Sequence, residues 1–146
     1  MTDIVDTRTR SRMMAGIRSK DTKPEMLVRR FLHARGFRYR LHDEKLPGSP
    51  DIVLAKYHLV IFVHGCFWHR HAGCRFATTP AQNRGDWIRK FNQNMVRDKK
   101  QIQFLVDNGW RVLVIWECGL KSSNMDLLWL PEFVKSNHEF YTEWPK

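Results

Sequence analysis

The sequence predicts an α/β fold in which a central mixed β-sheet is flanked by helices. Two apolar runs, Leu59 to Val63 and Val112 to Trp116, have the continuous hydrophobic character of strands buried on both faces. A long amphipathic segment between the two runs has helical periodicity. The chain has 146 residues, enough to bury one hydrophobic core. We therefore expect a single domain over residues 1–146.

The first helix is expected to begin at a capping box, Thr22-Lys23-Pro24-Glu25, with Thr22 as the N-cap and Glu25 at the third position. It should end at Gly36, a residue typical of helix C-termini. Residues 37–41 alternate like a strand, and residues 51–54 form a second strand before the run at 59–63.

Residues 64–85 form an insert rich in His, Cys, Gly and aromatic residues. A stretch of this length without regular structure needs something to hold it in place. Asp86 then caps a helix to about Asn108, ended by Gly109, and the strand at 112–116 follows. The tail is expected to be helical around residues 125–135. The expected order of elements is α-β-β-β-α-β.

The formal net charge is +10, and it is concentrated in the first two-thirds of the chain. Residues 1–40 carry a net +7 and residues 41–100 a net +5. Residues 1–20 are interpreted as a mobile basic arm that orders on a phosphate backbone. Such a basic surface favours nucleic acid as the partner. A solvated surface or a disordered tail would have the same distribution of basic residues in the sequence.

Localisation is also constrained by composition. No apolar run exceeds five residues, which excludes a membrane span, and the polar, basic start has no secretory signal. We expect a cytoplasmic protein with no membrane partner.

The three cysteines indicate a metal site rather than disulfides. Cys66, His71 and Cys74 have the spacing Cys-x4-His-x2-Cys, and Cys118 supplies a fourth ligand at the end of a strand. Four nitrogen or sulfur ligands are what a closed structural zinc site requires. Bound Zn²⁺ would also attach the insert to the sheet. The alternative is three buried free thiols.

Asp51 stands at the start of one strand, as the first acidic residue does in the PD-(D/E)xK nuclease pattern. The corresponding triplet on the next strand, Phe62-Val63-His64, lacks both the second carboxylate and the lysine. Asp51 and the backbone carbonyl of Val63 can still hold Mg²⁺ together with water, and His64 can replace the lysine. A Pro-Asp pair before a strand is, however, also a common turn.

From Arg10 to Cys118 the chain resembles the very-short-patch-repair (Vsr) DNA mismatch endonucleases. The resemblance is most specific at Phe62-Val63-His64-Gly65-Cys66-Phe67-Trp68-His69. It also rests on Arg10 to Met14, Asp21 to Glu25, Leu46 to Asp51, Gly109 to Val112 and Trp116 to Cys118.

The resemblance implies a PD-(D/E)xK fold with a structural zinc and a Mg²⁺-dependent nicking enzyme. Such an enzyme cuts 5′ to the T of a T:G mismatch, the product of 5-methylcytosine deamination. The implied substrate is double-stranded DNA, and the implied partners are mismatch-repair proteins and a repair polymerase. We expect a monomer in a prokaryotic cytoplasm, associated with the nucleoid.

The resemblance also implies roles for individual residues. Asp51 is the Mg²⁺ carboxylate, and the carbonyl of Val63 contacts the same ion. His69 is the general base, Asp98 orients it, and His64 contacts the scissile phosphate or the attacking water, although the two histidines could exchange roles. Glu25 lies near the metal, and the zinc ligands are Cys66, His71, Cys74 and Cys118, with one extra residue before Cys74.

Several residues are implied to contact DNA. Phe67, Trp68 and Trp87 are expected to intercalate at the mismatch, because opening a base step is offset by stacking on aromatic rings. The residues implied to touch the mismatched pair are Met14, Lys90 and Asn94. The alternatives are that Phe67 or Trp87 packs in the core and that Lys90 and Asn94 are only solvated.

Three other functions remain open from the sequence. His64, His69 and His71 could hold a catalytic zinc in a metallohydrolase. A zinc-stapled DNA-binding module would bind without cleaving. A restriction-like nuclease would use the same residues on matched DNA.

Overall fold

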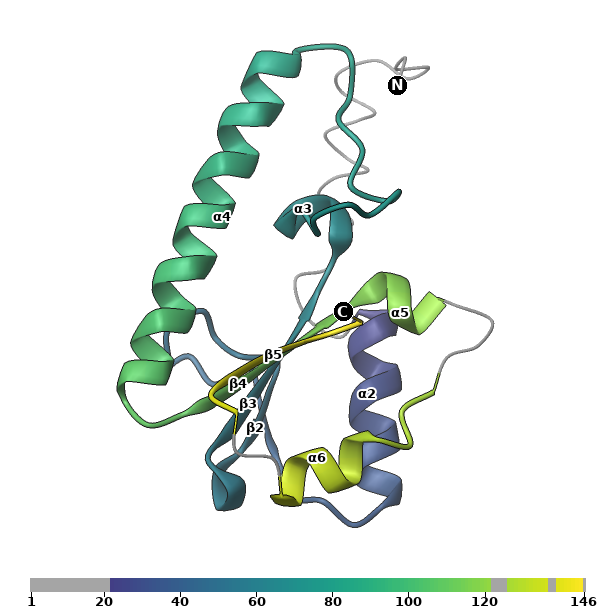
Figure 1. Cartoon of the computed structure of the whole chain (residues 1–146), viewed down its shortest axis with the longest axis vertical. Coiled ribbons are helices and arrows are strands. Elements are labelled where there is room, and N and C mark those ends of the chain that lie inside the picture. The colour runs from purple at the N-terminus through teal and green to yellow at the C-terminus, as the bar shows by residue number, and fades with distance from the viewer. Residues whose placement is uncertain (1–21, 122–125, 137–138, 146) are drawn as a thin grey trace.

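The computed structural model describes residues 22–121, 126–136 and 139–145. Its centre is a sheet of five strands in the order β1-β2-β3-β4-β5 (Figure 1). The strands are β1 (Arg40–Leu41), β2 (Ile52–Leu54), β3 (Leu59–His64), β4 (Arg111–Trp116) and β5 (Tyr141–Trp144). β1, β2 and β3 pair antiparallel, whereas β3, β4 and β5 are parallel. The prediction of a mixed sheet is confirmed.

Helices cover both faces of this sheet. They are α2 (Lys23–Ala34), α3 (Cys66–His69), α4 (Arg84–Asp107), α5 (Glu117–Lys121) and α6 (Leu130–Ser136), with the 3-10 turn η1 (Ala55–Tyr57). α2, α5 and α6 lie on one side, and α4 lies on the other, where it extends well past the sheet (Figure 1). No helix in the described part of the chain has the length and apolar character to cross a membrane.

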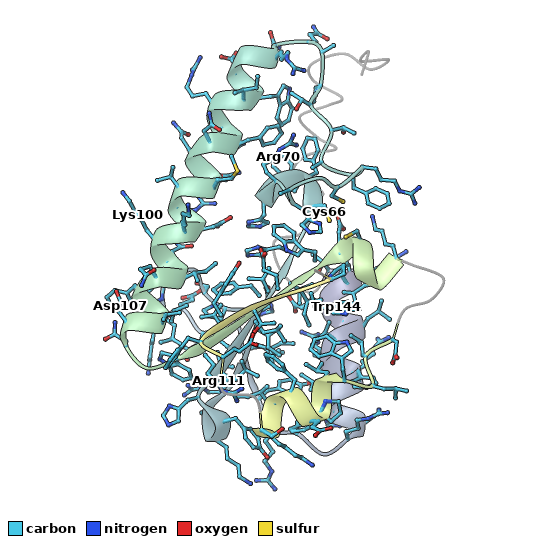
Figure 2. The ribbon with its side chains drawn as sticks, viewed as in Figure 1. Cys66, Arg70, Lys100, Asp107, Arg111 and Trp144 are labelled. Carbon is cyan, nitrogen blue, oxygen red and sulfur yellow. The ribbon has the colours of Figure 1, made fainter. Side chains whose placement is uncertain are left out.

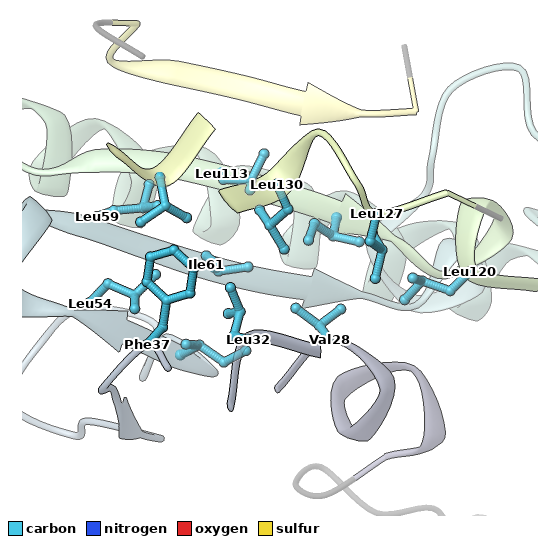
Figure 3. Close-up of a cluster of buried hydrophobic side chains, with 13 residues drawn as sticks. Val28, Leu32, Phe37, Leu54, Leu59, Ile61, Leu113, Leu120, Leu127 and Leu130 are labelled. Carbon is cyan, nitrogen blue, oxygen red and sulfur yellow. The ribbon is translucent and has the colours of Figure 1, made fainter. Parts of the chain in front are cut away.

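The strand β3 is buried on both faces, as its sequence predicted. Leu59 and Ile61 pack in a core with Val28 and Leu32 of α2 (Figure 3). Val60 and Phe62 point the other way, into a second core that includes Leu105 of α4. Successive strand residues point to opposite faces, so a strand between two helical layers is apolar throughout.

The end of α2 explains why the predicted strand at 37–41 is shorter than expected. Gly36 has φ +84°, and its N–H donates to the carbonyl of His33. The Phe37 N–H donates back to the carbonyl of Leu32, which completes a Schellman motif. Phe37 therefore still belongs to the helix end, and only Arg40 and Leu41 pair with β2.

Two further boundaries differ from the predictions. α4 starts at Arg84 after an Asn83 N-cap with φ +56°, so Asp86 lies in the first turn and is not the cap. The tail forms α6 at 130–136 rather than a helix over 125–135, and α5 and β5 were not predicted. α5 has five residues and β5 has four, so neither is long enough to show a clear hydrophobic period.

Arg70 holds the insert at 64–85 together, a role that the sequence analysis missed. Its guanidinium donates to the carbonyls of Phe67, Ala77 and Thr78 and to the hydroxyl of Thr79. Arg70, labelled in Figure 2, also lies over the ring of Phe91 on α4. Its Cζ is 4.0 Å from the ring centroid. The half-buried guanidinium of Arg70 thus connects several parts of the insert to one another and to α4.

Candidate active site

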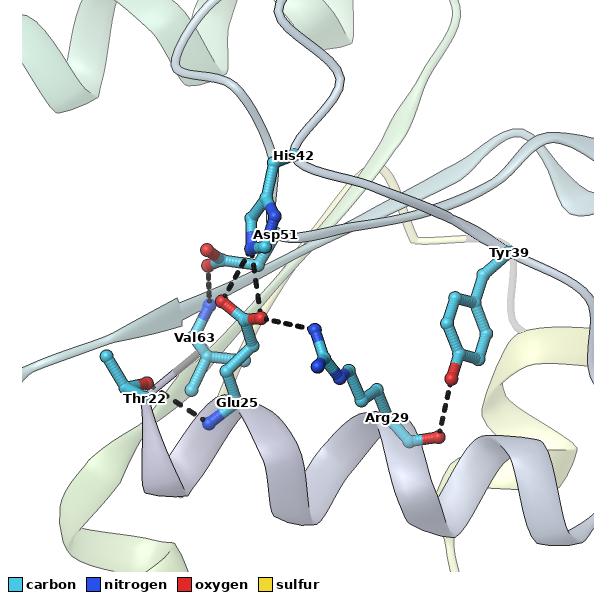
Figure 4. Close-up of polar contacts among 7 residues, drawn as sticks. All are labelled: Thr22, Glu25, Arg29, Tyr39, His42, Asp51 and Val63. Carbon is cyan, nitrogen blue, oxygen red and sulfur yellow. Dashed lines mark hydrogen bonds and ion pairs between the residues drawn. The ribbon is translucent and has the colours of Figure 1, made fainter. Parts of the chain in front are cut away.

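A carboxylate cluster lies where α2 meets the start of β2 (Figure 4). Glu25 is 1% exposed, and both of its oxygens are 2.9 Å from Nε2 of His42. Arg29 donates to Oε2 of Glu25 at 3.1 Å. The ligand atoms of Glu25, His42 and Asp51 all lie within 4.8 Å of one another. Glu25 therefore places a second carboxylate beside Asp51, from a helix rather than from the strand that the pattern would use.

The capping box at the start of α2 is only half formed for this reason. The hydroxyl of Thr22 accepts the N–H of Glu25 at 3.3 Å, as predicted. The Glu25 carboxylate does not complete the box but turns toward His42 and Arg29.

Asp51, immediately before β2, is held in place by the neighbouring strand β3. The Val63 N–H donates to Oδ2 of Asp51 at 2.7 Å. Burial raises the pKa of Asp51 from 3.8 to about 8, the Val63 N–H opposes this, and nearby Glu25 adds to it. The site disfavours a second negative charge in the absence of a cation, and a bound divalent cation would reverse that preference.

Two histidines and an aspartate form the other wall of the same cleft. The rings of His64 and His69 are stacked, with centroids 3.8 Å apart. Nδ1 of His69 is 2.6 Å from Oδ2 of Asp98 on α4. His64 is buried, and burial followed by the proximity of His69 lowers its pKa well below the ordinary value. His64 is therefore neutral at physiological pH.

These groups open into one cavity of about 470 Å³. It is lined by His42, Ser49, Asp51, Val63, His64, His69, Arg97, Asp98 and Gln101, among others. The predicted site residues Asp51 and Asp98, 47 positions apart in the chain, thus line the same cavity. Glu25 lies behind Asp51 and does not line the cavity.

All four predicted thiol and imidazole ligands gather at a separate point. Atoms of Cys66, His71, Cys74 and Cys118 lie within 4.8 Å of one another. Nδ1 of His71 is 3.4 Å from Sγ of Cys118 and 3.8 Å from Sγ of Cys66. Burial raises the pKa of the Cys66 thiol to about 12, so a thiolate there needs a positive partner.

The indole of Trp116 joins the two sites. It stacks on His71 at 4.4 Å between centroids and contacts the edge of His64 at 5.2 Å. Its Nε1 donates to Oε1 of Glu143 on β5. His71 therefore belongs to the thiol cluster, and the structure does not place it with His64 and His69 in a three-histidine site.

The predicted DNA-contacting aromatics form a half-buried cluster between α3 and α4. Phe67 is 5.0 Å from Trp68, 5.7 Å from Trp87 and 5.1 Å from the buried Phe91, between ring centroids. Lys90 lies 5.4 Å from the Trp68 ring. Asn94 donates to the Trp68 carbonyl at 3.3 Å, so it positions α3 in this structure. Met14 and the basic arm lie outside the described residues.

The helix α4 is strongly basic. Its exposed basic residues are Arg84, Arg89, Lys90, Arg97, Lys99 and Lys100. The cleft combines a carboxylate cluster with a histidine–aspartate pair, and a basic helix lies beside it. These are the groups that hydrolysis of a phosphodiester requires.

Comparison with known proteins leads to the same class. A family described as "DNA mismatch endonuclease Vsr" matches residues 2–75. A type II nicking enzyme of Neisseria meningitidis is 49% identical over 122 residues, which cover 84% of this chain and 86% of that enzyme. A type II nicking enzyme of Xanthomonas oryzae is 47% identical, over 82% of this chain and 88% of its own.

The DNA mismatch endonuclease Vsr of Escherichia coli is 42% identical over 121 residues, or 83% of this chain and 77% of that protein. The chain therefore belongs to the Vsr family of DNA mismatch endonucleases, as its sequence motifs suggested. Its substrate is DNA, and nucleases of this kind use a divalent metal.

The sequence analysis missed His42. The residue follows β1 with φ +48°, and its N–H donates to the carbonyl of Asp51 at 3.2 Å. A left-handed conformation at a residue other than glycine has no clear sequence signal. A histidine within ten residues of a candidate metal carboxylate was the one hint available.

Proposed function

We propose that this protein nicks double-stranded DNA on the 5′ side of the T in a T:G mismatch. The observation that carries the proposal is that Asp51 and the His69–Asp98 pair face the same cavity. A metal carboxylate and a general base must reach the same phosphodiester for hydrolysis. The β3–α4–β4 arrangement with Asp51 beside it supports a PD-(D/E)xK fold.

The oxygen atoms around Asp51 fit Mg²⁺. Strand pairing between β2 and β3 ends at Ile52 and Ile61, so Val63 is beyond the ladder. In an extended strand the N–H and the carbonyl of one residue point to the same side. The Val63 carbonyl therefore faces Asp51, as its N–H does. Asp51 and this carbonyl, with Glu25 behind them, would hold Mg²⁺, which stabilises the charge on the phosphate.

The roles of the histidines follow from their surroundings. Asp98 accepts the Nδ1 proton of His69, which leaves Nε2 of His69 free to take a proton from water. His64 is buried and neutral, so it acts as a hydrogen-bonding group for the phosphate or the water. Arg97, which also lines the cavity, is placed to contact a phosphate.

We propose that the thiol cluster holds a structural zinc ion. Tetrahedral ligands at Zn–S and Zn–N bond lengths of about 2.3 and 2.1 Å lie about 3.6 Å apart. The distances of 3.4 and 3.8 Å from Nδ1 of His71 to the two sulfur atoms lie on either side of that value. The zinc ion would then join the insert, which carries His64 and His69, to Cys118 after β4.

We further propose that the aromatic cluster reads the mismatch, with Lys90 and Asn94 beside it. A wobble pair is easier to distort than a matched pair, and stacking on Trp68 or Phe67 offsets the cost of opening. The proposed setting is a monomer of one domain in the bacterial cytoplasm, where mismatch-repair proteins and a repair polymerase process the nick.

A nicking assay tests the proposed function directly. An end-labelled duplex with one T:G pair is compared with its T:A twin, with Mg²⁺ or with a chelator. A single Mg²⁺-dependent cut 5′ to the T, absent from the twin, is expected. Equal cutting of both duplexes would indicate a restriction-like enzyme and contradict the proposal.

Asp98→Asn is expected to lower kcat for nicking by about 100-fold or more, because the amide no longer fixes the His69 tautomer. DNA affinity should stay unchanged, because Asp98 would not contact the substrate. Asp107→Asn, the same change at an exposed position near the end of α4, is the control and should nick normally. Unchanged kcat in Asp98→Asn would remove Asp98 from the mechanism.

Trp68→Ala is expected to lower the preference for T:G over matched duplex by about 10-fold, since one base–aromatic stack contributes about 1–3 kcal/mol. Competition binding with the two duplexes measures the ratio. Phe140→Ala removes another exposed ring, 61% exposed and outside the cluster, and should leave the ratio unchanged. A constant ratio in Trp68→Ala would refute intercalation by this residue.

A further inference from the structure

His42 stands at the catalytic cleft, yet neither the acidic pattern nor the proposed mechanism uses it. Its side chain is 13% exposed and it lines the cavity together with Asp51. The chain around it is fixed at two points, because the His42 N–H donates to the Asp51 carbonyl and its Nε2 reaches Glu25. The imidazole is therefore held in one place beside the proposed metal carboxylate.

We propose that His42 is a nitrogen ligand for Mn²⁺ when that cation occupies the catalytic site. Together with Glu25 and Asp51 it would form a mixed imidazole–carboxylate site that binds Mn²⁺ more tightly than an all-oxygen site would. This inference rests on the proposed function, in which Asp51 holds a metal in the cleft.

The distances within the cluster fit this arrangement. Two adjacent ligands of an octahedral ion, at bonds of about 2.1 Å, lie about 3.0 Å apart. Nε2 of His42 lies 2.9 Å from each Glu25 oxygen. The imidazole of His42 and the carboxylate of Glu25 therefore lie at nearly the same separation whether a hydrogen bond joins them or both bind one metal ion. Arg29 can keep Oε2 of Glu25 while the other oxygen faces the ion.

The donor set then determines which cation is favoured. Mg²⁺ takes oxygen ligands and retains several waters, so it would use Asp51 and the Val63 carbonyl and gain little from an imidazole. Mn²⁺ also binds well to oxygen donors, but as a transition-metal ion it accepts an imidazole nitrogen more readily than Mg²⁺ does. The His42 imidazole would thus raise the affinity of the site for Mn²⁺ and leave its affinity for Mg²⁺ nearly unchanged.

Metal titration of the full chain tests the proposal without measuring nicking. One equivalent of Zn²⁺ is added first to fill the thiol cluster, and Mn²⁺ or Mg²⁺ binding is then measured by calorimetry. In His42→Gln, whose amide can still donate to Glu25, the Kd for Mn²⁺ is expected to rise at least 10-fold. The Kd for Mg²⁺ should change less than 3-fold.

His58→Gln is the matched control. His58 also has a left-handed backbone, with φ +50°, but it is exposed at the opposite end of β3 from His64. It should bind both metals like the unchanged protein. If His42→Gln is unstable, His42→Asn replaces it, because asparagine tolerates the left-handed conformation.

Pulsed electron paramagnetic resonance on bound Mn²⁺ gives a direct signature. An imidazole ¹⁴N coupling is expected in the unchanged protein and should disappear in His42→Gln. Equal weakening of Mn²⁺ and Mg²⁺, unchanged binding of both, or a ¹⁴N coupling that persists in the variant would each overturn the proposal. Failure of the unchanged protein to bind either metal in an Asp51-dependent way would instead overturn the proposed function itself.

Discussion

Asp51→Asn is expected to abolish nicking and, without added Mg²⁺, to make the protein more stable. Nicking should fall at least about 1,000-fold, because the proposed Mg²⁺ loses its central carboxylate. Stability should rise because the asparagine amide carries no charge. It can still accept the Val63 N–H, and it can donate to Glu25.

The pH dependence of this effect has a definite sign. The pKa of Asp51 is about 8 in the folded protein, above its ordinary value of 3.8. The folded state therefore binds the proton more tightly, and stability falls as pH rises from about 4 to 8. Asp51→Asn should remove this part of the slope and gain at least about 1 kcal/mol at pH 7, or a Tm increase of about 2–4 °C.

Thermal unfolding at pH 5, 6, 7 and 8 measures the effect, with the nicking assay in parallel. Asp86→Asn is the control, because that carboxylate is exposed on α4 and paired with Arg89. It should change neither stability nor its pH dependence. A Tm for Asp51→Asn that is lower than that of the unchanged protein would show that the charged carboxylate stabilises the fold.

Cys118→Ser is expected to have the largest effect on stability. It removes a ligand of the proposed zinc site. The insert would then lose its metal-mediated connection to α5, which directly follows β4. A structural zinc site stabilises a small domain strongly, so we expect a loss of more than about 3 kcal/mol and a fall in Tm of at least about 6 °C. Nicking should fall as well, because His69 lies between Cys66 and His71.

Metal content separates this effect from a simple packing defect. The unchanged protein and Asp51→Asn should each retain one tightly bound zinc per chain, measured by elemental analysis, whereas Cys118→Ser should lose it. A full equivalent of tightly bound zinc in Cys118→Ser would contradict the four-ligand assignment.

Strong periodicity made part of the fold predictable. The runs at 59–63 and 112–116 are apolar on both faces and formed β3 and β4, and Gly36 ended α2 as expected. β5 was missed because it is a short edge strand with exposed and half-buried residues, paired with β4 alone in the described chain. Its register depends on contacts that no local pattern reports.

The candidate site was predictable where ligand chemistry or resemblance pointed to it. The cysteine spacing identified four residues that the fold does bring together. The pairing of His69 with Asp98, 29 residues away, came from the resemblance alone. His42 and Arg70 were missed because both depend on left-handed backbone positions and on tertiary contacts formed only after folding.

The residues of the two sites alternate along one short segment. His64 and His69 serve the cleft, while Cys66 and His71 serve the thiol cluster, with the single turn of α3 between them. One added residue in α3 would rotate the residues after it by about 100° and misplace both sets at once. The length of this segment is therefore fixed by two independent requirements, and insertions or deletions are expected only after His71.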